Sequence, residues 1–192
     1  MTNIYLVSDT HFNHKKLCSN EEVHFDITRK YKFVNEMNDD IIKQWNNTIT
    51  NDDIVYFLGD FMLGTPFKEI KDKCKYYLSL LNHKNLIWIE GNHDGCLKKV
   101  LSDEKILYKT IQFIYNGKLY VLQHEDYNEV PEILNSIDFE HNDVVLVHGH
   151  THSFEKTSIV SYKGKELIQN NVCWEAWYKP VSLNELKNVN GK

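Results

Sequence analysis

Three histidines stand within five residues where an apolar run near residues 143–147 comes to an end. They are His148, His150 and His152, in the sequence Val-His-Gly-His-Thr-His. Imidazole nitrogens are common ligands of transition metals. On an extended loop His150 and His152 would point to the same side as each other, so this spacing indicates a metal site. We expect a structural role for His148, because we read its side chain as turned away from the metal.

Further oxygen and nitrogen donors follow four other short apolar runs. They are Asp9 and His11 after residues 4–7, Asp60 after 54–58, Asn92 and His93 after 86–89, and His124 after 119–122. Continuous apolar runs of this length are typical of buried strands. Open α/β sheets form their ligand sites at the carboxyl ends of strands, so we expect five strand ends to bring these donors to one edge.

The spacing of apolar residues predicts the elements around these strands. Two amphipathic helices are predicted by helical spacing, from Val34 to Trp45 and from Phe67 to Leu81. A short third helix is predicted at residues 97–101. The order strand, helix, strand over residues 54–89 predicts a right-handed parallel crossover. The first half of the chain therefore indicates a parallel sheet covered by helices.

The second half is richer in hairpin signals. Asn116 and Gly117 separate two apolar runs at 111–115 and 118–122, which predicts a tight hairpin. A second hairpin is expected at 157–168, a surface helix near 130–137, and a short final helix capped by Ser182 and Glu185. The fold class is therefore α/β, with two stacked sheets and helices outside.

Composition indicates an ordinary globular protein with a single domain over residues 1–192. The chain is 42% hydrophobic and 26% charged, with a formal net charge of -5. Its lysines are scattered among acids, so a nucleic-acid partner is conceivable but not indicated. No apolar run approaches the roughly 20 residues of a membrane span, and the four cysteines show no paired spacing. We expect a cytoplasmic protein without a membrane partner.

The ordered set of motifs resembles the calcineurin-like metallophosphoesterases. It comprises Asp9 with His11, Gly59-Asp60, Gly91-Asn92-His93-Asp94, His124, and Gly149-His150-Thr151-His152. The segment 171–182 is similar to the same region of small bacterial and phage members. This resemblance implies a four-layer α/β/β/α sandwich of two mixed β-sheets flanked by helices.

The resemblance also implies two divalent metal ions. Asp9, His11, Asp60 and His152 would hold one ion, and Asn92, His124 and His150 the other, with the Asp60 carboxylate bridging both. Mixed imidazole and oxygen donors suit manganese, our first choice, and also iron, zinc, cobalt or nickel. A hydroxide between the two ions would attack a phosphate ester.

Three side chains near the ligands are candidates for other steps. His93 would protonate the leaving oxygen or fix the phosphate, with Asp94 or the backbone orienting it. The polar segment 12–33 predicts a long loop over the site, or merely a floppy insertion, and carries His14 and Arg29. These two are our candidates for substrate binding, although solvated surface is the commoner place for such side chains; Arg29 is the only arginine in the chain.

Two departures from the protein-phosphatase branch favour a phosphodiester substrate. That branch has a second aspartate three residues after the bridging one, where this chain has Leu63. It also has arginines where this chain has Gly64 and Glu90. A phosphomonoester carries two negative charges, and it would lose its clamp here and meet a carboxylate.

Two other functions stay open at this point. A phosphomonoesterase or nucleotide pyrophosphatase would need Arg29, Lys15 or Lys16 to reach a small phosphate-ester or nucleotide substrate. A non-catalytic protein-binding scaffold is the second, as in the retromer subunit of this fold, although such scaffolds tend to lose ligands that this chain keeps. The sequence carries no signal for the oligomeric state.

Overall fold

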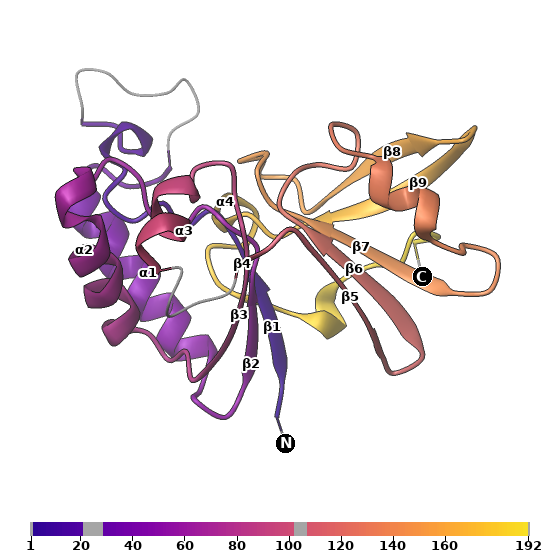
Figure 1. Ribbon diagram of the computed structural model, residues 1–192, viewed down its shortest axis with the longest axis horizontal. Helices are drawn as coiled ribbons and strands as arrows, with labels where there is room; N and C mark the ends of the chain where they lie inside the picture. Colours follow the sequence, from indigo (N-terminus) through magenta and orange to yellow (C-terminus); the bar gives the residue numbers. More distant parts are fainter. Residues whose placement is uncertain (1, 21–28, 102–106, 192) are drawn as a thin grey trace.

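Two five-stranded sheets pack face to face in the computed structural model, which describes residues 2–20, 29–101 and 107–191 (Figure 1). The first sheet has the order β10-β1-β2-β3-β4 and the second β5-β6-β7-β9-β8. The first comprises β1 (Ile4–Val7), β2 (Ile54–Phe57), β3 (Asn85–Ile89), β4 (Leu107–Tyr108) and β10 (Val181–Ser182). The second comprises β5 (Thr110–Tyr115), β6 (Lys118–Gln123), β7 (Asp143–His148), β8 (Thr157–Tyr162) and β9 (Lys165–Asn171).

Both sheets are mixed, and their central strands are parallel. In the first sheet β1, β2, β3 and β4 run parallel and β10 antiparallel. In the second sheet β6, β7 and β9 run parallel, while β5 and β8 pair antiparallel with their neighbours. Parallel strands end at the same edge, so each sheet delivers several loops to one edge.

Helices cover the outer face of the first sheet (Figure 1). The α-helices are α1 (Val34–Thr48), α2 (Phe67–Leu80), α3 (Gly95–Leu101) and α4 (Trp174–Trp177). Three short 3-10 helices are η1 (Lys15–Leu17), η2 (Glu132–Ser136) and η3 (Leu183–Glu185). The Ser182–Glu185 capping box predicted from the sequence begins η3.

The apolar core is divided into three layers that match the predicted sandwich. Trp45 of α1, Phe57 of β2 and Trp88 of β3 belong to the cluster between the helices and the first sheet. A second cluster lies between the two sheets, and a third covers the outer face of the second sheet, where Leu134 and Ile137 pack. The α/β/β/α architecture is confirmed, and its last layer is thin because η2 is only five residues long.

The polar segment before α1 packs into the fold where the structure describes it. Leu17, Cys18, Arg29 and Tyr31 are all buried, at 0–4% exposure. The description of residues 12–33 as a floppy insertion is therefore wrong for these positions. Single apolar residues that recur without a period carry too weak a signal to predict this burial. Residues 21–28 lie outside the described part of the chain.

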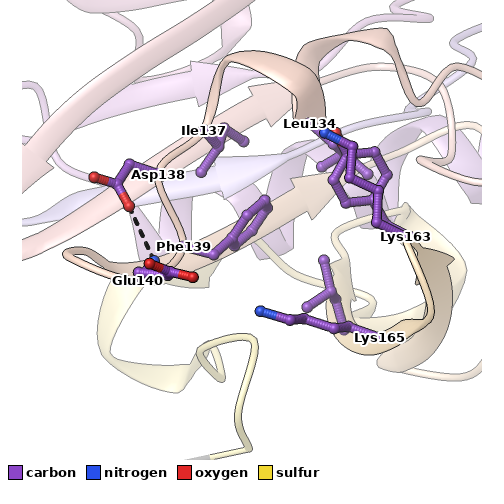
Figure 2. Close-up of a pocket in the computed structure, with 9 residues that line it drawn as sticks. Leu134, Ile137, Asp138, Phe139, Glu140, Lys163 and Lys165 are labelled. Carbon is purple, nitrogen blue, oxygen red and sulfur yellow. Dashed lines mark hydrogen bonds between the residues drawn. The ribbon is translucent and has the colours of Figure 1, made fainter.

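Two further findings concern the surface. Within the described residues, no helix is both long and apolar enough to cross a bilayer. A shallow pocket of about 260 Å³ opens beside η2 and the β8–β9 hairpin (Figure 2). Its lining is Leu134, Ile137, Asp138, Phe139, Glu140, Tyr162, Lys163, Lys165 and Leu167. These residues include no predicted ligand, so the metal-binding motifs lie elsewhere.

The α1 packing gives a stability prediction. Trp45 is fully buried, and its indole Nε1 donates a 2.8 Å hydrogen bond to the carbonyl of Asn82 after α2. Trp45→Phe would leave that carbonyl without this donor and should lower the free energy of unfolding by about 1–3 kcal/mol. Urea denaturation measures this. Phe67→Leu, at a side chain that is 61% exposed, is the control and should change little. Equal stability of wild type and Trp45→Phe would contradict the packing.

Candidate metal centre

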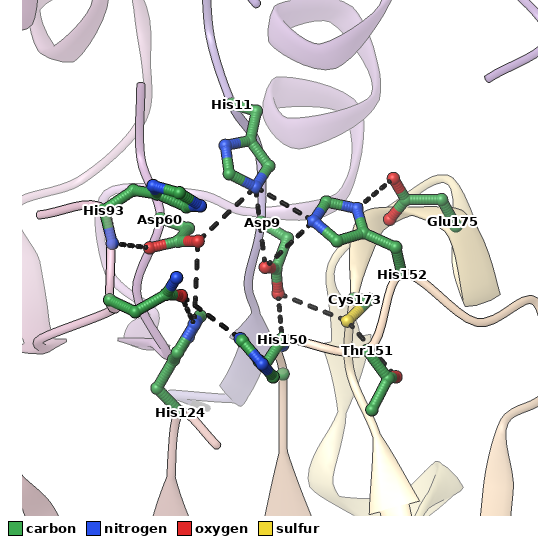
Figure 3. Close-up of polar contacts among 12 residues, drawn as sticks. Asp9, His11, Asp60, His93, His124, His150, Thr151, His152, Cys173 and Glu175 are labelled. Atoms are coloured by element: carbon green, nitrogen blue, oxygen red, sulfur yellow. Dashed lines mark hydrogen bonds and ion pairs between the residues drawn. The ribbon is translucent and has the colours of Figure 1, made fainter. Parts of the chain in front are cut away.

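The ends of strands from both sheets meet at one edge, and their loops carry the predicted donors (Figure 3). The loop after β1 runs beside the loop after β2, since the amide of Asp9 donates to the carbonyl of Gly59 at 2.9 Å and that of His11 to Asp60 at 3.0 Å. The loop after β7 joins them, because the amide of His150 donates to Asp9 Oδ2 at 3.0 Å. The sheet edge therefore forms one continuous site.

Three donors form the first cluster, which we define as Asp9, His11 and His152. The Nε2 atoms of His11 and His152 lie 3.1 Å apart. Asp9 Oδ1 lies 3.7 Å from each of these nitrogens. One ligand atom from each residue therefore faces a common point, as a bound cation requires.

The second cluster consists of Asn92, His124 and His150. The amide oxygen of Asn92 lies 2.9 Å from His124 Nε2 and 3.1 Å from His150 Nδ1. Asp60 stands between the two clusters, with Oδ2 3.5 Å from His11 Nε2 and 3.6 Å from His124 Nε2. The structure thus brings all seven predicted ligands together, with Asp60 where a bridging carboxylate would be.

The hydrogen bonds behind the histidines direct lone pairs into the site. His124 Nδ1 lies 2.6 Å from the carbonyl of Leu58, and His152 Nδ1 lies 2.8 Å from Glu175 Oε1. Both partners are acceptors, so each Nδ1 carries the proton and each Nε2 presents a lone pair. Within the described part of the chain, the buried Oδ1 of Asp9 has no hydrogen-bond partner. An unpartnered carboxylate oxygen beside converging lone pairs fits a divalent cation.

Burial and mutual repulsion shape the ionisation of the two carboxylates. Burial, strengthened by the charge of Asp9, raises the pKa of Asp60 to about 7. Burial opposes ionisation of Asp9 too, but the nearby imidazoles of His11, His124 and His152 hold the pKa of Asp9 well below its usual value. Burial lowers the pKa of His11 to about 3, which keeps that imidazole neutral as a ligand must be.

Five of the seven predicted ligands adopt a left-handed backbone conformation. The φ angles are 56° at Asp9, 48° at His11, 59° at Asp60, 69° at His150 and 50° at His152. Non-glycine residues seldom adopt this conformation, which costs free energy and persists where the surroundings enforce it. Such a concentration at one sheet edge marks a functional site.

Two glycines let neighbouring backbones approach the carboxylates. A Cβ at Gly91 would lie 2.1 Å from Asp60 Oδ1, and one at Gly149 would lie 2.7 Å from Asp9 Oδ2. Both distances are far inside van der Waals contact. These positions therefore need glycine for the two carboxylates to keep their places.

Asp94 has a different role from the predicted one. Its carboxylate accepts hydrogen bonds from the backbone amides of Asp60, Phe61 and Gly91 at 2.9–3.1 Å and from the Trp88 indole at 3.3 Å. The prediction that it orients the His93 ring is wrong, because these contacts use both oxygens. Asp94 instead joins the loops after β2 and β3.

His93 lies at the solvent side of the centre. Its ring is edge-on to that of His11 at a centroid distance of 5.7 Å, and its backbone amide donates to Asp60 Oδ1 at 2.9 Å. Partial burial lowers its pKa. His93 is exposed, so a substrate that reached the two clusters would also reach this imidazole.

The two predicted substrate-binding residues lie near the site, but Arg29 does not face substrate. Its guanidinium is fully buried and pairs with Glu175 at 2.7 Å, while donating to the carbonyl of Thr10 at 2.8 Å. That prediction is wrong, because the guanidinium is bonded to Glu175 and to the backbone of the loop after β1. His14 is buried with its ring centroid 5.4 Å from that of His11.

Two other side chains make their bonds away from the clusters. The carboxylate of Glu90 pairs with Lys98 at 2.8 Å and Lys109 at 3.3 Å. These lysines offset the charge that we expected to repel a phosphomonoester. The buried ring of His148 makes a 2.8 Å hydrogen bond from Nδ1 to the carbonyl of Gly149, as a structural residue would.

Sequence reasoning missed two residues that contact the ligands. Glu175 of α4 is bonded to His152, and the thiol of Cys173 donates to Asp9 Oδ2 at 3.2 Å. Burial, with the charges of Asp9 and Glu175, raises the pKa of this thiol well above its usual value. The available signal was a lone acid between Trp174 and Ala176, since a carboxylate in an apolar stretch needs a partner.

A family model and two relatives match nearly the whole chain. The sequence model described as calcineurin-like phosphoesterase matches residues 2–189. An uncharacterized protein of Methanocaldococcus jannaschii is 36% identical over 190 residues, which cover 96% of this chain and 89% of that protein. The solved structure of a protein of unknown function from Aquifex aeolicus shares 26% identity and a TM-score of 0.65, over 96% of this chain and 97% of its own.

The position of Asp60 gives a prediction for metal content. Asp60→Ala should abolish binding of both ions, because one carboxylate lies between the two clusters. His152→Ala should chiefly weaken the ion of the first cluster and leave the other partly bound. Elemental analysis after manganese loading and desalting measures both. Two ions per chain in Asp60→Ala would show that this residue does not bridge.

The close approach at Gly91 gives another prediction. Gly91→Ala should displace Asp60 and lower the metal content, since the added Cβ falls on the carboxylate. Gly95→Ala is the matched control, because a Cβ there would meet nothing within 4 Å. Wild-type metal content in both variants would contradict the geometry.

Proposed function

The chain belongs to the calcineurin-like phosphoesterase family, and from that premise we propose that it hydrolyses phosphodiester bonds with two divalent metal ions. Membership supports phosphoester hydrolysis in general. The number of ions and the preference for a diester are our proposals. Manganese is our first choice of metal, with iron, zinc, cobalt or nickel as alternatives.

One observation carries the proposal. The Asp60 carboxylate lies between the two clusters, 3.5 Å from His11 Nε2 and 3.6 Å from His124 Nε2. Two divalent ions bound there would supply a hydroxide nucleophile at neutral pH and neutralise charge on the phosphoryl group. The side chains of the two clusters and Asp60 would set the positions of the two ions.

Charge balance supports an anionic substrate. Two ions contribute +4, the carboxylates of Asp9 and Asp60 -2, and a hydroxide -1, which leaves +1. The buried pair of Arg29 and Glu175 adds zero. Asn92 contributes a neutral amide oxygen where a third carboxylate would cancel the positive charge. A phosphate ester would therefore be drawn to the site.

His93 is our candidate for the proton-transfer step. Its imidazole is exposed beside His11 and belongs to neither cluster. It would donate a hydrogen bond to a phosphoryl oxygen or a proton to the leaving oxygen. His14 is a candidate for the other side of the substrate, next to His11.

The preference for a diester now rests on one argument rather than two. Arg29, the only arginine of the chain, is buried against Glu175, so no arginine can clamp a dianionic monoester. Glu90 no longer contributes, because lysines pair with it. Lys15 and Lys16 are exposed on η1 next to His14, and they sustain the alternative of a phosphomonoesterase or nucleotide pyrophosphatase. The complete donor set argues against a scaffold.

Two chromogenic substrates test the proposed function. The manganese-loaded protein should cleave bis(p-nitrophenyl) phosphate faster than p-nitrophenyl phosphate. His93→Ala should lower kcat by about 10²–10⁴-fold and leave metal content unchanged. His141→Ala is the control, since this exposed histidine bonds Asp138 on the surface. A faster monoester rate would favour the alternative, and equal rates with manganese alone would refute catalysis.

A further inference from the structure

One histidine of each cluster is held from behind, and the two partners are unlike. Behind His124 of the second cluster stands a backbone carbonyl, that of Leu58 at 2.6 Å. Behind His152 of the first cluster stands a carboxylate, Glu175 Oε1 at 2.8 Å (Figure 3). A charged acceptor increases the basicity of an imidazole more than a neutral one does. The two clusters are therefore supported differently.

The carboxylate of Glu175 is kept ionised inside the protein. It is 3% exposed, and its Oε1 also accepts from Arg29 Nε at 2.7 Å. Arg29 supplies the opposite charge for this buried carboxylate, and His152 bonds the same oxygen at 2.8 Å. A buried carboxylate with both a guanidinium and an imidazole on one oxygen holds His152 in a single tautomer.

Arg29 extends this support to the other residues of the first cluster. Besides Glu175, its guanidinium donates to the backbone carbonyls of Asp9 and Thr10, in the loop that carries Asp9 and His11. One buried cation thus fixes the backbone of Asp9 and of its neighbour Thr10 and, through Glu175, the ring of His152. The hydrogen bonds of Arg29 and Glu175 among the described residues do not reach the second cluster.

We propose that Glu175 and Arg29 are positioning residues that set the affinity of the first cluster for its metal ion, independently of the second cluster. This inference rests on the proposed metal centre and deepens it. Glu175 fixes the Nε2 lone pair of His152 toward the ion and strengthens it as a donor. Arg29 keeps Glu175 ionised and anchors the loop of Asp9 and His11.

The test is metal affinity at each site, measured without turnover. Manganese titration of wild type should resolve two sites by calorimetry. In Glu175→Gln the amide oxygen can still accept from His152, but the negative charge is gone. The manganese affinity of the first cluster should fall by about 10–100-fold, and the second cluster should keep its affinity. General loosening of the fold would weaken both, so selective loss separates positioning from a merely structural role.

Folding needs its own control, because Glu175→Gln leaves Arg29 buried without its ion pair. The double variant Arg29→Met with Glu175→Gln removes both charges and should show the same selective loss. Asp40→Asn changes a carboxylate that pairs with Lys30 and Tyr31 on the same side of the fold, and both sites should stay at wild-type affinity. Circular dichroism checks each variant.

The outcomes separate this inference from the function itself. Wild-type affinity at both sites in the double variant, or equal weakening of both, would overturn the role of Glu175 and Arg29 even in an active enzyme. A wild type that binds two ions but cleaves neither ester would refute the proposed function and leave the affinity comparison intact.

Discussion

Mutual repulsion among buried acceptors is the constraint on which the site depends. Asp9 and Asp60 are 0–1% exposed, and imidazole nitrogens of both clusters lie 3.5–3.7 Å from their oxygens. Such an arrangement is unfavourable in a low-dielectric interior unless positive charge enters. Rigid surroundings hold these groups in place, and bound divalent cations would replace their repulsion with attraction.

Several features of the fold serve that rigidity. Parallel strands in both sheets end at one edge, and left-handed residues turn the chain sharply after β1, β2 and β7. Gly91 and Gly149 allow the loops to lie against the carboxylates. Asp94 joins the loops after β2 and β3 through backbone amides. The precision of the centre therefore comes from backbone contacts more than from side-chain packing.

The sequence predicted the elements whose local signal is strong. Uninterrupted apolar runs marked β1 and β2, and Asn116-Gly117 marked the β5–β6 hairpin. The two-residue strands β4 and β10 are too short for any periodicity, and they form because neighbouring strands offer unpaired edges. Donors at strand ends were predictable because topology brings strand ends together.

Roles set by long-range contacts were beyond the sequence. Arg29 has a side chain of the kind that clamps phosphate, and only the tertiary packing shows that it pairs with a carboxylate 146 residues away. Asp94 sits beside His93 in the chain, yet the turn directs its oxygens to backbone amides. Adjacent residues on a tight loop diverge, so proximity in sequence misled the assignment.

Anomalous diffraction from manganese-soaked crystals tests the central claim most directly. The account predicts two peaks about 3.5–4 Å apart, one on each cluster, with Asp60 contacting both. A single peak, or two peaks with Asp60 bound to one or neither, would contradict it.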